Sequence, residues 1–312
     1  MTTPLQEAMA RRMRARFGPP GVFRRGYLAG VLGGTAALIL IVIAALLLFP
    51  PPRTNILLLG LDRRSGEATF VSRTDTLILI TVYAEQGYVG MLALPRDLWV
   101  ALPGGNEGRI NTAHFFAEAN ERGAGPAAAL ETVRQNFGVD MHRFMRLDFQ
   151  GFVKIIDALG GIEIDLPRPL IDDEYPTEDY GVQTVEFKAG RQWLTGERAL
   201  IYARIRHGDS DFQRAERQEA VIRAFVARLT QPGAWLRLPA TFAAIRESVS
   251  TDLTPLEMIR LAPTFLRVGP SGLDQRVLKD EMVQPYTTAN GASVLLPVWQ
   301  NINPVLRQMF GQ

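Results

Sequence analysis

Between Leu28 and Phe49 the chain runs through 22 residues without one charged side chain, reading LAGVLGGTAALILIVIAALLLF. About 20 consecutive apolar residues allow a helix to cross the hydrocarbon core of a bilayer. Six arginines and one acid precede this run: Arg11, Arg12, Arg14, Arg16, Arg24 and Arg25, with Glu7. Because positive charge is retained on the cytoplasmic side, we expect a cytoplasmic basic tail (1–27), a single transmembrane anchor (28–49) in the plasma membrane, and an extracytoplasmic remainder.

A cleaved signal peptide is the alternative interpretation of this segment. The run is longer than a usual signal core, and no small-x-small cleavage site comes before Pro50-Pro51-Pro52. These two features favour an uncleaved anchor, followed by a short linker (50–54). The chain has no cysteine, which excludes disulfides, thiolate metal sites and cysteine nucleophiles.

The distribution of charge argues against nucleic acid as a partner. The basic tail carries a net charge of +5, whereas the whole chain carries only +2, so the remainder carries −3. The basic isoelectric point therefore belongs to the tail. Nucleic-acid binding by the rest of the chain has no electrostatic basis.

Continuous apolar runs follow the linker and predict three strands. They cover Asn55–Asp62, Thr76–Tyr83 and Tyr88–Leu94, with a turn between the last two at residues 85–87. A short apolar run without alternation is typical of a strand that is buried on both faces.

Helical patterns alternate with further strands along the chain. We expect helices at 111–121, 126–137, 150–159 and 211–229, and strands at 144–149 and 162–166. This alternation predicts an α/β domain (55–230) with a central, mostly buried sheet flanked by helices. Residues 170–188 are polar and predicted to form an irregular excursion or lid. The pattern leaves residues 200–206 open between strand and helix, and predicts that 231–312 form an appendage packed on the domain.

Acidic side chains stand where the predicted strands begin or end. Asp62 closes the first strand and Asp75 comes just before the second. Ligands of open α/β sheets gather where strands end, and two carboxylates without histidine or cysteine suit Mg²⁺. The alternative is that both aspartates are turn residues paired with Arg63, Arg64 or Arg73.

Arg96 and Asp97 follow a proline at the end of the third strand. An arginine at that place is suited to neutralise the charge that develops during phosphoryl transfer, if the turns nearby form a phosphate site. Asp97 is then either a base or the partner that aims Arg96. Further on, Asn111 is the expected N-cap of a helix, and Phe149 is either a core residue or part of an apolar channel.

A second cluster combines arginines with one glutamine. It comprises Arg204, Arg206, Arg214, Arg217 and Gln218. Guanidinium groups offer planar, permanently charged donors that suit phosphate oxygens, and residues 214, 217 and 218 share a face near a predicted helix N-terminus. A solvated helix face crossed by salt bridges is the alternative. His114, His142 and His207 show no metal spacing and are interpreted as ordinary polar residues.

In order, spacing and residue type, six blocks of the sequence together resemble the LytR–CpsA–Psr family, also called cell-envelope-related transcriptional attenuator domains. The blocks are Asn55–Asp62, Arg73–Thr76, Leu94–Val100, Arg109–Ala113, Asp148–Ile162 and Ala199–Gln218. The resemblance implies an α/β domain with a hydrophobic groove for a polyprenyl tail. It also implies a phosphotransferase that moves a glycopolymer from undecaprenyl pyrophosphate to a cell-wall acceptor, commonly peptidoglycan.

Roles for individual residues follow from the same resemblance. Asp62 and Asp75 match the family's magnesium-binding pair, a site for Mg²⁺ or Mn²⁺, and Arg96 matches the arginine implicated in transfer. Five positions match pyrophosphate contacts, with Arg217 in the same block: Arg64, Arg204, Arg206, Arg214 and Gln218. Arg109 stands where the family usually has lysine, which preserves the charge.

Two other functions remain open at the level of sequence. A lipid pyrophosphatase would use the same site with water as the acceptor. A non-enzymatic envelope sensor would bind polyprenyl phosphates, and it would keep the arginines while tolerating loss of Asp62 and Asp75.

Overall fold

The computed structural model describes residues 3–17, 27, 30–31, 33–35, 37, 49–63, 70–177, 181–205 and 211–311. Most of the expected membrane anchor, and the predicted site residues Arg64 and Arg206, lie outside these residues. The chain forms two compact units, residues 1–50 and 51–312. The first contains helix α1 (Pro4–Phe17). Within the residues described, no helix has both the length and the apolar character needed to cross a bilayer.

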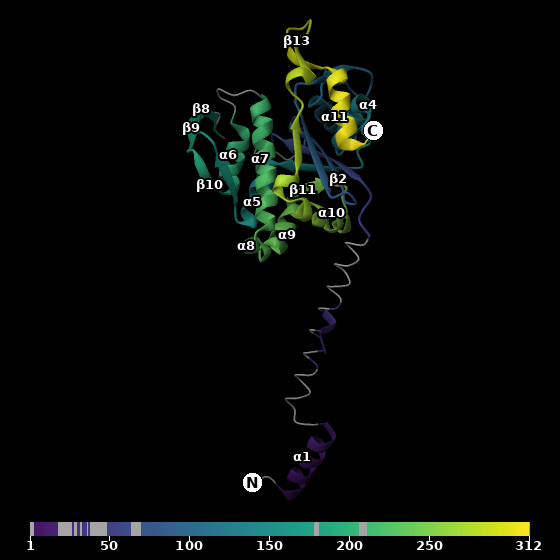
Figure 1. Ribbon diagram of the computed structural model, residues 1–312, viewed down its shortest axis with the longest axis vertical. Coiled ribbons are helices and arrows are strands. Elements are labelled where there is room, and N and C mark those ends of the chain that lie inside the picture. The colour runs from purple at the N-terminus through teal and green to yellow at the C-terminus, as the bar shows by residue number, and fades with distance from the viewer. Residues whose placement is uncertain are drawn as a thin grey trace. The chain divides into compact units, whose positions relative to one another are not determined.

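A six-stranded mixed sheet, counted over the described residues, forms the centre of the second unit (Figure 1). In spatial order its strands are β11 (Val249–Thr251), β6 (Arg143–Asp148), β1 (Thr54–Leu61), β2 (Thr74–Tyr83), β3 (Tyr88–Leu94) and β12 (Asp274–Val277). β1, β2 and β3 are antiparallel neighbours, whereas β6 runs parallel to β1 and β12 parallel to β3. The three apolar runs predicted as strands are confirmed.

Helices cover both faces of this sheet, which explains why its strands are apolar without alternation. Leu57 and Leu59 face the side covered by α4 (Gly125–Phe137) and α11 (Trp299–Phe310). Ile56 faces the side covered by α7 (Asp211–Thr230) and α10 (Pro255–Val268). Because successive side chains of a strand point to opposite faces, the consecutive residues Ile56, Leu57, Leu58 and Leu59 of β1 are all apolar.

A third apolar cluster lies beside the sheet. It is built from α5 (Phe149–Leu159), α6 (Gly196–Arg204), α7, and the paired strands β7 (Ile162–Leu166) with β10 (Gly190–Leu194) and β8 (Leu170–Pro176) with β9 (Val182–Phe187). The expectation that 170–188 is irregular is wrong, because β8 and β9 pair antiparallel and bury Tyr175, Val185 and Phe187. Residues 200–204 are helical, and Thr195 caps that helix by accepting from the Arg198 amide.

The chain after Thr230 contributes two strands to the central sheet. Its remaining elements are α8 (Pro232–Trp235), α9 (Leu238–Ser248), β13 (Val283–Thr287) and β14 (Ser293–Pro297). Both edge strands, β11 and β12, come from this segment, and Ile302, Leu306 and Met309 of α11 are fully buried. The structure therefore differs from the expected packed appendage, since these residues complete the sheet and its core.

Candidate functional site

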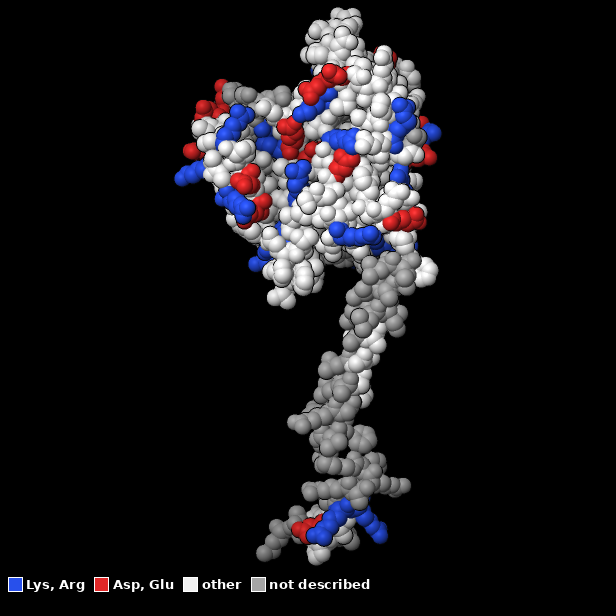
Figure 2. Space-filling model, in the orientation of Figure 1, with Lys and Arg blue, Asp and Glu red and all other residues white. Residues whose placement is uncertain are grey.

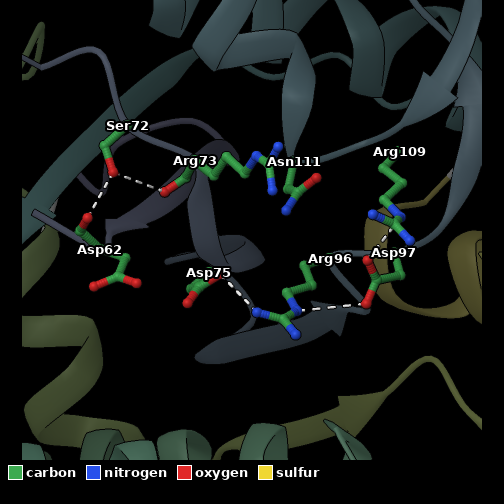
Figure 3. Close-up of a pocket in the computed structure, with 8 residues that line it drawn as sticks. All are labelled: Asp62, Ser72, Arg73, Asp75, Arg96, Asp97, Arg109 and Asn111. Atoms are coloured by element: carbon green, nitrogen blue, oxygen red, sulfur yellow. Dashed lines mark hydrogen bonds and ion pairs between the residues drawn. The ribbon is translucent and has the colours of Figure 1, made fainter. Parts of the chain in front are cut away.

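The pairing of β1, β2 and β3 brings three predicted site residues together. The end of β1 pairs with the start of β2 (Leu61 with Thr74), and the start of β2 pairs with the end of β3 (Leu77 with Leu94). Asp62, Asp75 and Arg96 follow or open these strand ends, so they lie around one pocket (Figure 3). The sequence places them 34 residues apart at the extremes; the sheet makes them neighbours.

This pocket has a volume of about 310 Å³ and a strongly polar lining. Its lining residues are Asp62, Ser72, Arg73, Asp75, Arg96, Asp97, Arg109 and Asn111. The size lies at the lower end of the range for small-molecule sites. On the face of the domain seen in Figure 2, basic and acidic side chains are interspersed rather than segregated.

A chain of ion pairs crosses the pocket (Figure 3). Arg96 Nη1 lies 3.0 Å from Asp75 Oδ1, and Arg96 Nε lies 3.4 Å from Asp97 Oδ2. The other Asp97 oxygen lies 3.0 Å from Arg109 Nε. Asp97 is thus held between two guanidinium groups, an arrangement that aims both arginines at the pocket.

Strands β4 (Trp99–Ala101) and β5 (Glu107–Arg109) form an antiparallel hairpin. Because the chain reverses direction in this hairpin, Arg109 and Asn111 lie close to the end of β3. The backbone N–H of Asn111 donates to the backbone carbonyl of Arg96 at 3.3 Å. Asn111 is the N-cap residue of the following helix, α3 (Thr112–Asn120), as predicted, but its side chain makes no cap hydrogen bond. The side chain lines the pocket instead, and its Oδ1 is buried without a hydrogen-bond partner among the described residues.

Part of the arginine cluster meets the same site. Arg214 and Gln218, near the start of α7, line a narrow adjoining cleft together with Asp75, Arg96 and Phe212. Arg204, at the end of α6, lies 3.9 Å from Asp62. Arg217 is buried, donates to the Ile205 carbonyl, and is not among the lining residues of the pocket or the cleft.

Two aromatic side chains hold Arg204 in place, and sequence reasoning missed both in this role. The guanidinium lies 4.1 Å from the ring centre of Phe149 and donates to the Tyr175 hydroxyl at 3.2 Å. Burial raises the pKa of Tyr175, although the nearby Arg204 opposes the shift. No local signal marks Tyr175, because it reaches the site only through the fold of the β8–β9 hairpin.

If Asp62 and Asp75 were only turn residues, Arg63 would be expected to pair with one of them. The ion pair that Arg63 makes is with another aspartate. That guanidinium contacts Asp148, whose other carboxylate oxygen caps α5 through the Gly151 amide. Arg73, expected only as such a partner, is one of the residues that line the pocket (Figure 3).

The oxygen donors in the pocket fit a hard cation whose remaining coordination positions are filled by substrate and water. Among the described residues, no group of three or more His, Asp and Glu side chains could hold a metal alone. Asp62 and Asp75 supply two carboxylates, and the buried Asn111 Oδ1 supplies a neutral oxygen without a protein partner. Mg²⁺ is commonly held in this way, by one or two carboxylates together with phosphate oxygens and water.

These features define an α/β protein whose polar pocket combines carboxylates with arginines, as phosphate-binding sites do. The chain belongs to the LytR_cpsA_psr family, whose sequence pattern matches residues 52–310.

Two similar proteins carry the name of a teichoic acid transferase. The polyisoprenyl-teichoic acid–peptidoglycan teichoic acid transferase TagU of Oceanobacillus iheyensis is 31% identical over 259 residues, covering 82% of this chain and 75% of the relative. TagU of Halalkalibacterium halodurans is 32% identical over 203 residues, covering 64% and 60%. An uncharacterised Staphylococcus aureus protein, SAOUHSC_00997, is 31% identical over 68% of this chain, and the match spans about half (51%) of that protein.

Solved structures confirm the fold. The crystal structure of Bacillus subtilis TagV superimposes with a TM-score of 0.68 at 23% identity, covering 84% of this chain and 99% of TagV. TagT bound to LIIa-WTA superimposes with a TM-score of 0.62 at 21% identity, covering 84% and 92%. At these identities the likeness shows a shared α/β architecture.

Proposed function

We propose that this protein transfers a phosphate-linked glycopolymer from an undecaprenyl-pyrophosphate carrier to a hydroxyl group of the cell wall, with peptidoglycan as the acceptor. The observation that carries the proposal is the position of Arg96, which contacts Asp75 on one side and Asp97 on the other inside a polar pocket. The names of the TagU relatives support the same chemistry. The proposed setting is the outer face of the plasma membrane, with residues 28–49 as the anchor.

The residues divide into two groups around the pyrophosphate. Arg96 and Arg109 line the pocket, Arg214 and Gln218 line the adjoining cleft, and Arg204 lies near Asp62. These five side chains are proposed to bind the phosphate oxygens. Arg64 and Arg206 are proposed to add to this group. Asp62 and Asp75, with the Asn111 amide oxygen, would hold Mg²⁺ or Mn²⁺, which neutralises phosphate charge when bound.

The transfer step follows from this arrangement. The acceptor oxygen attacks the phosphorus nearest the glycan, the bond to the bridging oxygen breaks, and undecaprenyl phosphate leaves. Charge stabilisation by fixed donors supplies most of the catalysis in phosphoryl transfer, so the site needs no protein nucleophile. Asp97 aims Arg96 and Arg109, and the leaving phosphate, whose second pKa is about 6, accepts the hydroxyl proton.

The test uses the purified full chain in detergent, incubated with a polyprenyl-pyrophosphate glycan and Mg²⁺, with and without peptidoglycan fragments. Mass spectrometry should show glycan phosphate linked to the acceptor and lipid monophosphate released in equal amount. Release of lipid monophosphate without any acceptor-linked glycan would show that the protein is a pyrophosphatase and not a transferase. Tight binding that leaves the lipid intact with every acceptor, and that tolerates loss of Asp62 and Asp75, would establish a binding protein.

A further inference from the structure

Three ionisable side chains form a buried group that contacts Ser72, a residue of the pocket lining. His114 and Glu118 come from α3 and Arg146 from β6, and their exposed fractions are 0%, 4% and 6%. A buried ion pair contributes little net stability, because the cost of desolvating both charges roughly offsets their attraction. Net stabilisation alone therefore gives little reason for a buried ion pair at this place.

Glu118 fixes the position of Arg146. Its two carboxylate oxygens accept from the backbone amides of Gly123 at 2.9 Å and Gly125 at 3.1 Å. Arg146 Nη1 donates to Glu118 Oε2 at 3.0 Å, and its other terminal nitrogen donates to Ser250 of β11 at 3.3 Å. The guanidinium is therefore held from two sides and has little freedom to move.

Arg146 in turn fixes the tautomer of His114. Arg146 Nη1 lies 3.2 Å from His114 Nε2, and His114 Nδ1 lies 3.3 Å from the Ser72 carbonyl oxygen. Since the guanidinium can only donate, Nε2 must accept and Nδ1 must carry the proton given to Ser72. Burial, and then the charge of Arg146, lower the pKa of His114 to about 4, which agrees with a neutral ring.

Ser72 connects this group to the pocket. Its hydroxyl donates to the Asp62 carbonyl oxygen at 2.7 Å, and the Asp62 amide donates to the Arg73 carbonyl at 3.4 Å. Phe70, two residues earlier, has the Arg146 guanidinium 4.0 Å and the Arg63 guanidinium 4.6 Å from its ring centre. The buried group thus reaches the backbone on which Asp62 and Asp75 are carried.

We propose that Glu118, Arg146 and His114 form a positioning group that fixes residues 70–73, which lead into β2, and so sets the relative position of Asp62 and Asp75. The proposal deepens the proposed function and rests on it where the cation is concerned. None of the three side chains is among the residues lining the pocket, so they act through Ser72 rather than on substrate.

The test is a paired substitution, Glu118→Gln with Arg146→Met, in the full chain. It removes both buried charges together, and the glutamine oxygen can still accept from Gly123 while the Gly125 amide loses its acceptor, so the melting temperature should fall by about 10 °C or less. We expect hydrogen exchange at residues 70–76 to accelerate about tenfold or more. Calorimetric titration should show Mg²⁺ affinity weakened about tenfold or more, as when groups supporting metal ligands are lost.

A matched control removes another ion pair of the same strand. Arg143 contacts Glu257 at 2.8 Å at the start of α10, and Arg143→Met with Glu257→Gln should leave exchange at residues 70–76 and Mg²⁺ binding unchanged. If the first pair does not fold, Arg146→Lys is measured in the same way, because lysine keeps the charge beside Glu118 but lacks the second donor arm.

Unchanged exchange at residues 70–76 in a folded variant overturns the positioning role. Exchange is measured without substrate, so it decides this proposal independently of activity. Faster exchange in the variant, combined with no transfer by the unmodified protein, supports the positioning role and removes only the proposed function.

Discussion

Arg96 Nη1 lies 3.0 Å from Asp75 Oδ1, so the arginine proposed to stabilise the transferring phosphate contacts a carboxylate proposed to bind the cation. Asp75 lies at the start of β2 and Arg96 just after the end of β3. These two strand ends are adjacent because β2 and β3 are antiparallel neighbours. A guanidinium beside a carboxylate competes with a cation for the same oxygens. The contact therefore couples cation binding to the position of Arg96.

Arg96→Ala should separate these two effects. Transfer should fall by about 10²-fold to 10³-fold, the usual cost of removing one fixed donor from a charge-stabilising site. Mg²⁺ binding measured by calorimetry should be retained or strengthened, because the competing cation is gone. Arg134→Ala, which removes an exposed ion pair on α4, is the control. Undiminished turnover of Arg96→Ala would remove Arg96 from the mechanism.

Asp97→Asn distinguishes aiming from proton transfer. Because Asp97 is held between Arg96 and Arg109, its loss should loosen both arginines and lower kcat by about tenfold to a hundredfold. The shape of the pH–rate profile should stay the same, since Asp97 is not the group that accepts the proton. Disappearance of the acidic limb from the profile of the variant would show instead that Asp97 is the general base.

Tyr175→Phe tests the contribution of the β8–β9 hairpin. The substitution removes the hydroxyl that accepts from Arg204 and leaves the buried ring in place. Arg204 should then bind phosphate less well, and KM for the lipid-linked glycan should rise about threefold to tenfold, which matches the net contribution of about 1 kcal/mol from one typical hydrogen bond. Steady-state kinetics measure the effect, with Tyr286→Phe, an exposed residue of β13, as the control. Equal KM values in both variants would exclude a role for the hairpin in orienting Arg204.

The sequence predicts those parts of the fold whose signals are local. The run from Asn55 to Leu61 is apolar at nearly every position because both faces of β1 are covered. Gly138 and Gly160 end α4 and α5 in left-handed conformations, at φ of 68° and 86°, which glycine adopts without strain. The linked ends of consecutive antiparallel strands meet, as they do in β1, β2 and β3, so the grouping of Asp62, Asp75 and Arg96 is predictable from the order of the apolar runs.

The remaining features depend on contacts between distant segments. β11 and β12 are only 3 and 4 residues long, too short to show a pattern, and they become strands because β6 and β3 offer free edges. Asn111 carries the usual signal of an N-cap, yet the β4–β5 hairpin places its side chain at the pocket. The local preference of asparagine is overridden there by tertiary structure.

Glu219 makes the stability of the protein depend on pH in a defined direction. It lies on α7, 5% exposed, and burial raises its pKa from 4.5 to about 7. Between these values the unfolded chain releases a proton that the native protein retains, so this group's contribution to the free energy of unfolding falls as pH rises. The full effect is on the order of 3 kcal/mol, at about 1.4 kcal/mol for each unit of pKa difference.

Glu219→Gln should remove this dependence, because the amide stays neutral at every pH. Chemical denaturation at about pH 4.5 and about pH 8 should therefore show the variant gaining stability relative to the unmodified protein at the higher pH. His114, whose pKa of about 4 makes the native protein lose stability as pH falls below about 6.5, affects both proteins equally and cancels in the difference. Glu247→Gln, an exposed acid of α9, should show no such gain. A constant difference between Glu219→Gln and the unmodified protein at both pH values would mean that Glu219 ionises normally in the folded state.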